Sequence, residues 1–191
     1  MPFYTLPNSI HKNLNSTSWY ELQFDNIIKQ KFDYSCGAAS LATIINYFNK
    51  LKVTEIEILK SITDPKTISF NDLKSISELY GFNTYGLEID HHQLQQLKIP
   101  AIIYIKDNKI DHFTVYVGVD SLKNIYLADP TWGHTKLSEE NFIKNWITNN
   151  NKGKVLLLIP KNKRNKYKAL RSERLELINI DKELKIQSLR N

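Results

Sequence analysis

The order of the hydrophobic patterns along this chain constrains its fold more than any other feature. Before residue 98 the patterns are mostly helical, and from residue 100 onward they are mostly those of short strands separated by turns at hairpin spacing. Helices first and an antiparallel sheet second is an α+β arrangement. We therefore expect N-terminal helices packed on a C-terminal antiparallel sheet.

The strongest helical signal runs from Ser35 to Asn49, where small and aliphatic residues form a mostly buried stripe. Ser35 suits the N-cap position, which would place Cys36 in the first turn. The first 25 residues show no clear periodicity and are expected to form an extended lead-in. The other expected helices are residues 53–62, 69–80, 90–97 and 138–146, and the expected strands are residues 82–87, 100–106, 112–119, 124–128 and 155–159.

The excess of positive charge lies at the end of the chain. The 191 residues carry a net charge of +6, yet residues 1–160 hold 16 basic and 16 acidic side chains, whereas residues 161–191 hold 10 and 4. The body therefore shows no charge-based preference for nucleic acid or membrane, and no nucleic-acid partner is expected. We expect one domain over residues 1–160. A basic extension over residues 161–191, partly helical or flexible, would suit an acidic partner.

The compartment of the protein is less constrained. No apolar run approaches the roughly 20 residues that a membrane helix needs, so no transmembrane segment is expected. The first ten residues lack the pattern of a signal peptide. The single cysteine excludes an internal disulfide, so the fold does not depend on an oxidising compartment. The expected location is cytoplasmic, or periplasmic if a signal peptide has been removed.

Cys36 is the first candidate for chemistry. At a helix N-terminus, the partial positive charge and the free N–H groups favour a thiolate, which is the nucleophilic form of cysteine. The small residues that follow it leave the sulfur approachable. A buried cysteine that packs an apolar helix is an equally good interpretation of the position alone.

Gln30 lies six residues before Cys36 and is a candidate oxyanion donor. An acyl-transfer enzyme needs donors aimed at the developing negative charge, and a glutamine amide together with the Cys36 backbone N–H could supply two. An ordinary surface glutamine is the alternative interpretation.

His112 is the candidate general base, since it opens an expected strand and would project over a cleft. Asp129 lies 17 residues later, at the end of the next expected strand, and adjacent hairpin strands would bring the two together. An aspartate that hydrogen-bonds the imidazole fixes its tautomer and stabilises the imidazolium. Asp111 is the rival for this role. Adjacent strand residues point to opposite faces, however, so Asp111 should not share the face of His112.

Three further residues are candidates for contact with a substrate. Asp33 precedes the nucleophile and would either cap its helix or bind substrate, with the cap favoured. Tyr34 adjoins it, and Trp132 would either wall the cleft or pack in the core. No metal site is expected, because His91 and His92 would point about 100° apart on a helix and one cysteine cannot supply a structural zinc site.

Three motifs resemble those of one family, the papain-like, bacteriocin-processing (double-glycine leader) cysteine peptidases. Residues 30–41, QKFDYSCGAASL, resemble its nucleophile motif. Residues 111–115, DHFTV, with Gly118 resemble its histidine motif. Residues 126–133, YLADPTWG, resemble its third motif, an Asp-Pro pair followed shortly by Gly. The motifs occur in the family's order, and the resemblance covers about residues 20–160.

The resemblance implies a papain-like fold and hydrolysis of a peptide bond in a precursor or leader peptide, often just after Gly-Gly. Gln30 then maps to the oxyanion position, Cys36 to the nucleophile, His112 to the base and Asp129 to the orienting group. The family's reaction needs no metal and no organic cofactor. Many members are domains of ABC exporters. This chain shows neither a membrane segment nor an ATPase motif, so it resembles the free-standing branch.

Three other functions remain open at the level of sequence. One is a domain of the same fold that binds peptides without cleaving them. Another is a papain-like amidase or acyl transferase that acts on a different substrate. The third is a nucleic-acid binder that relies on the basic extension.

Overall fold

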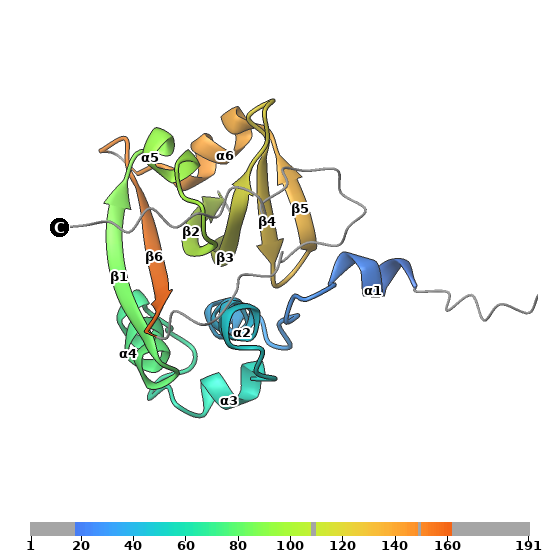
Figure 1. Ribbon diagram of the computed structural model, residues 1–191, viewed down its shortest axis with the longest axis vertical. Coiled ribbons are helices and arrows are strands. Elements are labelled where there is room, and N and C mark those ends of the chain that lie inside the picture. Colours follow the sequence, from blue (N-terminus) through green and yellow to red (C-terminus); the bar gives the residue numbers. More distant parts are fainter. Residues whose placement is uncertain (1–17, 108–109, 149, 162–191) are drawn as a thin grey trace, which may run out of the picture.

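The computed structural model describes residues 18–107, 110–148 and 150–161, which form an α+β fold as expected (Figure 1). The helices are α1 (Trp19–Gln23), α2 (Cys36–Asn49), α3 (Glu55–Leu59), α4 (Phe70–Leu79), α5 (His91–Gln95) and α6 (Glu139–Trp146). The strands are β1 (Phe82–Ile89), β2 (Ala101–Asp107), β3 (Ile110–Val119), β4 (Ile125–Asp129), β5 (Gly133–Leu137) and β6 (Gly153–Pro160). Of the expected basic extension, only Lys161 lies within the described residues.

The six strands form one antiparallel sheet in the order β1-β6-β2-β3-β4-β5. Strands β2 to β5 follow one another as a meander, because each connection between them is short. Strand β6 comes last in the chain and lies between β1 and β2, so it joins β1 to the meander. Because β1 pairs with β6, it lies at one edge of the sheet, although it directly follows the N-terminal helix α4 in the chain.

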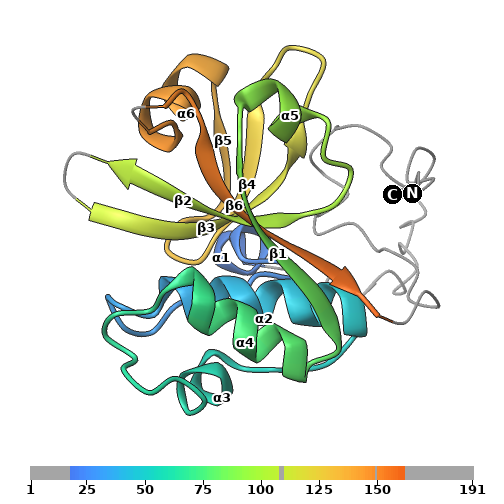
Figure 2. The same cartoon turned by 90° about the vertical axis from the view of Figure 1, so that its left-hand side faces the viewer.

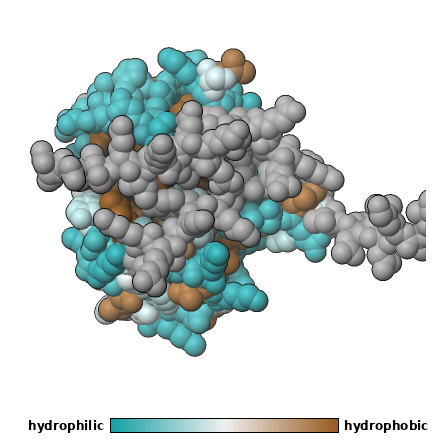
Figure 3. All heavy atoms as spheres, viewed as in Figure 1, coloured by the Kyte–Doolittle hydropathy of each residue, from teal (hydrophilic) through white to brown (hydrophobic). Residues whose placement is uncertain are grey.

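Helices cover both faces of the sheet (Figures 1 and 2). Helices α2, α3 and α4 lie on one face, and α2 contacts β3 directly. Its stripe of aliphatic residues, including the fully buried Leu41, Ile44 and Ile45, forms the larger core with the inward residues of the sheet. Helices α5 and α6 cover the other face through a second core that contains Leu94 and Trp146. The described residues on the face drawn in Figure 3 are mostly hydrophilic, because the side chains of both apolar cores are buried inside the protein.

Two elements were not expected from the sequence. Helix α1 lies within the expected extended lead-in, so that prediction was wrong for residues 19–23. The side chain of Ser18 accepts a hydrogen bond from the Glu21 backbone N–H, and the Glu21 carboxylate accepts one from the Ser18 backbone N–H, so a capping box starts this short helix. Strand β5 was also missed. It pairs with β4 over five residues and forms one edge of the sheet.

Candidate active site

Cys36 is the first residue of α2, as expected, and its side chain is buried. Ser35 occupies the N-cap position, but its hydroxyl does not cap the helix. The hydroxyl instead contacts the carbonyl oxygen of Phe32 and the carboxylate of Glu55, which lies on α3. The loop that leads into the helix is therefore fixed by contacts to its own backbone and to a neighbouring helix.

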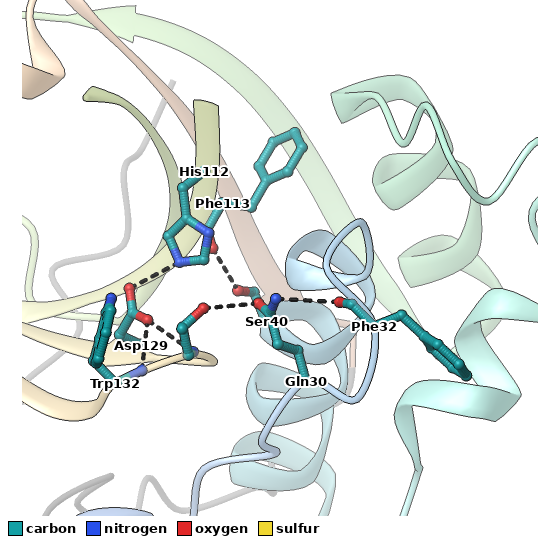
Figure 4. A network of polar contacts seen from close by, with 8 residues as sticks. Gln30, Phe32, Ser40, His112, Phe113, Asp129 and Trp132 are labelled. Carbon is teal, nitrogen blue, oxygen red and sulfur yellow. Dashed lines mark hydrogen bonds and ion pairs between the residues drawn. The ribbon is translucent and has the colours of Figure 1, made fainter. Parts of the chain in front are cut away.

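Helix α2 is attached to the strand that carries the histidine. The Ser40 hydroxyl, one turn after Cys36, donates a hydrogen bond of 3.3 Å to the carbonyl oxygen of Phe113 on β3 (Figure 4). Phe113 follows His112 directly, so this contact holds the start of α2 beside the histidine. Gly37 permits the approach, because a Cβ atom there would lie 3.1 Å from the Phe113 ring.

His112 and Asp129 are brought together by adjacent strands. Nε2 of His112 lies 2.9 Å from Oδ2 of Asp129 (Figure 4). His112 is the third residue of β3 rather than the first, because the strand begins at Ile110. Asp129 ends β4, as expected. The aspartate is buried and the imidazole is mostly buried.

The pKa of His112 reflects both burial and its two neighbours. Burial alone would lower it, but the hydrogen bonds with Asp129 and Cys36, and the charges of both groups, raise the pKa to about 9. Burial would raise the pKa of Asp129, yet the hydrogen bond and charge of His112 and two backbone N–H groups hold it below its usual range. The imidazole is therefore protonated at neutral pH, with a carboxylate on one side and a thiol group on the other.

The turn after β4 fixes the aspartate. Oδ1 of Asp129 accepts hydrogen bonds from the backbone N–H groups of Thr131, at 2.8 Å, and of Trp132, at 3.0 Å. Oδ2 is left for the imidazole. The carboxylate plane is thus set by its own turn, and His112 meets an acceptor whose orientation is already determined.

Asp111, the rival for the orienting role, lies on the other face of β3. It hydrogen-bonds the hydroxyl of Tyr104 on β2, and burial together with Asp111 and Cys36 raises the pKa of that hydroxyl. The alternation of side chains along the strand therefore places Asp111 with Tyr104 and places His112 with Asp129.

Gln30 lies beside the turn that holds the aspartate. Its backbone N–H donates to the carbonyl oxygen of Pro130 at 2.9 Å, and its side-chain oxygen accepts from the Thr131 hydroxyl at 3.0 Å. Its Nε2 donates to the carbonyl oxygen of Phe32 at 3.1 Å (Figure 4). Gln30 is partly buried, so it is not the ordinary surface glutamine of the alternative interpretation.

The three candidate substrate-binding residues are exposed. Trp132 is 66% exposed, so core packing is excluded for it. Tyr34 is 37% exposed and stacks on Phe32 in the loop before Cys36. Asp33 is exposed and makes no hydrogen bond to α2 within the described part of the chain, so the favoured capping role was wrong.

No group of three or more metal-ligating side chains is found among the described residues. His91 and His92 stack on each other in α5, with ring centroids 3.9 Å apart. His134 lies in β5 and contacts the carbonyl oxygen of Asp25 at 2.9 Å.

Sequence reasoning missed two residues beside the site. Thr131 contacts both Gln30 and Asp129. It lies in the middle of the third motif, residues 126–133, and nothing in the sequence distinguished it from its neighbours there. Glu55 is a buried carboxylate that accepts a hydrogen bond of 2.9 Å from the Lys31 backbone N–H and contacts the Ser35 hydroxyl. Nothing in the helical pattern of residues 53–62 singled it out.

Comparison with known proteins places the chain among peptidases. Residues 25–164 match the sequence model of the Peptidase C39 family. Over 134 residues the chain is 33% identical to the "probable functional amyloid protease FapD" of Pseudomonas aeruginosa, which covers 66% of this chain and 59% of that protein. It is 28% identical over 127 residues to the lactococcin-A transport/processing ATP-binding protein LcnC of Lactococcus lactis, which covers 63% of this chain and 18% of that protein. The chain thus spans only part of these curated relatives.

Solved structures show the same fold. The peptidase domain of Streptococcus ComA, a bi-functional ABC transporter, matches with a TM-score of 0.60 at 21% identity and covers 70% of this chain and 97% of that chain. A double glycine motif protease from an AMS/PCAT transporter, in complex with the leader peptide, matches with a TM-score of 0.60 at 25% identity and covers 70% and 90%. These likenesses confirm the predicted papain-like fold. The described residues include no helix long and apolar enough to cross a membrane.

Proposed function

This chain belongs to the Peptidase C39 family and is a cysteine peptidase, so we propose that it cleaves a peptide or protein precursor with Cys36, His112 and Asp129 as its catalytic residues. The contact of 2.9 Å between His112 Nε2 and Asp129 Oδ2 is the observation that carries this assignment, and Cys36 lies near enough to raise the pKa of the same imidazole. Cys36 is the nucleophile, His112 the acid and base, and Asp129 the group that orients the imidazole.

The reaction follows from the charge state of the pair. The Cys36 sulfur attacks the scissile carbonyl carbon as a thiolate, and the carbonyl electrons move to oxygen. His112 is protonated at neutral pH because its pKa is about 9, so it gives its proton to the leaving amine as the C–N bond breaks. The imidazole then takes a proton from water as the water oxygen attacks the thioester carbonyl. The C–S bond breaks, the acid leaves, and the thiolate and the protonated imidazole are restored.

Gln30 and the Cys36 backbone N–H are the proposed oxyanion donors. A donor aimed at the developing charge typically contributes a factor of about 10²–10³ to the rate. One Nε2 hydrogen of Gln30 is used by the Phe32 carbonyl, which leaves the second for the oxyanion. The first turn of α2 adds a partial positive charge at the same place.

The substrate proposed here carries small residues before the cleaved bond, with Gly-Gly as the first choice. Two observations support this proposal. A double glycine motif protease bound to a leader peptide shares the fold at 25% identity. The residues beside Cys36 are also tightly packed: a Cβ at Gly37 would lie 3.0 Å from Ile68, and Tyr104, Phe70 and Phe113 form an aromatic cluster there.

The test is cleavage of synthetic peptides, followed by mass spectrometry. The wild-type chain should cut a leader-like peptide after Gly-Gly, and Cys36→Ala and His112→Ala should leave it intact. A peptide with Leu in place of the second Gly serves as the matched control and should not be cut. Equal cleavage of both peptides would refute the Gly-Gly preference. Tight binding of the peptide without cleavage would favour the peptide-binding alternative.

The reactivity of the thiol gives a second test that needs no substrate. The rate at which iodoacetamide alkylates wild-type Cys36, measured against pH, should depend on His112, because the imidazole lies beside the sulfur. His112→Ala should be alkylated more slowly and with a different profile. Identical profiles for the two proteins would mean that His112 does not activate the cysteine.

A further inference from the structure

Two segments about 100 residues apart are joined by hydrogen bonds beside the site. The Gln30 backbone N–H donates to the Pro130 carbonyl, and the Thr131 hydroxyl donates to the Gln30 side chain. Gln23 adds a contact, because its Nε2 donates to the Trp132 carbonyl at 2.7 Å. The turn that holds Asp129 and the segment that carries Gln30 therefore lie in fixed register (Figure 4).

The side-chain amide of Gln30 makes two hydrogen bonds, one through its NH₂ group and one through its oxygen. The Phe32 carbonyl oxygen can only accept, so it requires the NH₂ group of the amide at 3.1 Å. The Thr131 hydroxyl donates to the amide oxygen on the other side at 3.0 Å. If the amide turned by 180°, its oxygen would meet the Phe32 carbonyl oxygen, and the Thr131 hydroxyl would have to rotate and accept from the NH₂ group instead.

The orientation of this amide decides whether an N–H group or an oxygen of Gln30 faces the oxyanion. With the NH₂ group toward Phe32, one N–H remains for the developing negative charge. If the amide were reversed, the amide oxygen of Gln30 would face the oxyanion in place of this N–H, and the two negatively charged oxygens would repel each other.

We propose that Thr131 is a positioning residue for the peptidase reaction, which acts by fixing the Gln30 amide as an oxyanion donor. This inference rests on the proposed role of Gln30. The Thr131 backbone N–H also donates to Asp129, at 2.8 Å, so one residue touches both the proposed oxyanion donor and the proposed orienting group. Only its hydroxyl contacts Gln30, which allows the two roles to be separated by substitution.

The test uses Thr131→Val, which removes the hydroxyl at nearly constant volume, and Thr131→Ser, which keeps it. Thr131→Val should lower kcat by about tenfold to a hundredfold, which is less than the factor of about 10²–10³ lost with a whole oxyanion donor, and should leave KM unchanged. Thr131→Ser should restore most of the rate. The alkylation profile of Cys36 should be the same in both variants, because alkylation forms no oxyanion and the backbone contact with Asp129 remains.

The dependence on Gln30 is tested in a double-mutant cycle. In a Gln30→Ala background, Thr131→Val should have no further effect on kcat. An unchanged kcat in Thr131→Val, an equal loss in the Gln30→Ala background, or an altered alkylation profile would each overturn the inference. If Gln30→Ala itself leaves kcat unchanged, the proposed oxyanion role fails, and the positioning role fails with it. If Gln30→Ala lowers kcat and Thr131→Val does not, the positioning role alone fails.

A measurement without turnover completes the test. The ¹H and ¹⁵N chemical shifts of the Gln30 side-chain amide should move toward those of free glutamine in Thr131→Val and stay near the wild-type values in Thr131→Ser. Wild-type amide shifts in Thr131→Val would show that the hydroxyl does not hold the amide, whether or not a cleavable peptide has been found.

Discussion

Asp129 meets His112 through one carboxylate oxygen and its own turn through the other: Oδ2 lies 2.9 Å from His112 Nε2, while Oδ1 accepts two backbone N–H groups. The carboxylate is buried and therefore interacts strongly with the imidazole. This relationship makes the proton affinity of His112 depend on a group with little freedom to move.

Replacing Asp129 with Asn should lower the pKa of His112. Burial of the imidazole disfavours its charged form, and the charge of Asp129 is one of the causes that raise the pKa to about 9. Without that charge the pKa should fall toward the ordinary value of about 6.5. The rate of peptide cleavage should fall by about 10²–10⁴-fold, the usual contribution of a positioned acid–base group. Titration of the His112 ring protons by NMR measures the shift.

Asp111→Asn is the matched control for this variant. It removes a carboxylate from the residue next to His112, but one that points to the opposite face and contacts Tyr104. It should leave the pKa of His112 near 9. A comparable drop in both variants would mean that general charge, rather than the contact with Asp129, sets the histidine pKa.

The raised pKa of His112 also predicts how stability depends on pH. A folded-state pKa of about 9, above the unfolded value of about 6.5, means that the folded protein binds the proton more tightly. This stabilisation is complete below about pH 6.5 and is lost as the pH rises through about 9. The difference in free energy of unfolding between the wild type and His112→Gln should therefore shrink between these values. Urea denaturation at pH 6, 7.5 and 9.5 measures it, and a difference that is constant with pH would contradict the assignment.

The pairing of His112 with Asp129 and the place of Cys36 at the start of a helix could be predicted from sequence, because these residues lie in three short motifs. Cys36 begins a helix whose small and aliphatic residues give a clear sequence signal, and His112 and Asp129 lie on consecutive strands whose pairing follows from a short connection. The preference for Asp129 over Asp111 rested on the match to the third motif and on the alternation of side chains along a strand.

The supporting contacts could not be predicted, because they join residues that are distant in sequence. Glu55 is buried only because α3 packs beside the loop before Cys36, and Thr131 reaches Gln30 across about 100 residues. Helix α1 has five residues, too few for periodicity to reveal, although its capping box at Ser18 and Glu21 was a readable signal. Asp33 was misassigned because Ser35 and Glu55, rather than an acidic cap, hold the start of α2.

Glu55 should matter for the stability of the loop before Cys36. Its Oε1 receives the Lys31 N–H and contacts the Ser35 hydroxyl, while Oε2 has no hydrogen-bond partner among the described residues. Glu55→Ala leaves the Lys31 N–H without this acceptor and leaves the Ser35 hydroxyl with only the Phe32 carbonyl, so it should destabilise the fold by about 1–3 kcal/mol. Glu55→Gln keeps one acceptor oxygen and should cost less. Urea denaturation measures both values.

Glu78→Ala is the control for Glu55, because Glu78 is an exposed glutamate on α4. Its loss should change the free energy of unfolding by no more than about 0.5 kcal/mol. If Glu55→Ala were as mild as Glu78→Ala, the two contacts of Glu55 would have no part in holding the loop.

Gly133 should tolerate no side chain, because the segment that contains α1 packs directly against it. Its φ is +76°, and a Cβ atom there would lie 2.2 Å from the carbonyl oxygen of Gln23. Gly133→Ala must therefore strain the turn and displace the N-terminal segment, at a cost of about 1–3 kcal/mol. Gly86→Ala on the edge strand β1 is the matched control, since a Cβ at that position meets nothing within 4 Å. Urea denaturation of both variants tests the contact: a loss of stability in Gly133→Ala no larger than that in Gly86→Ala would mean that residues 18–24 do not brace the turn after Asp129.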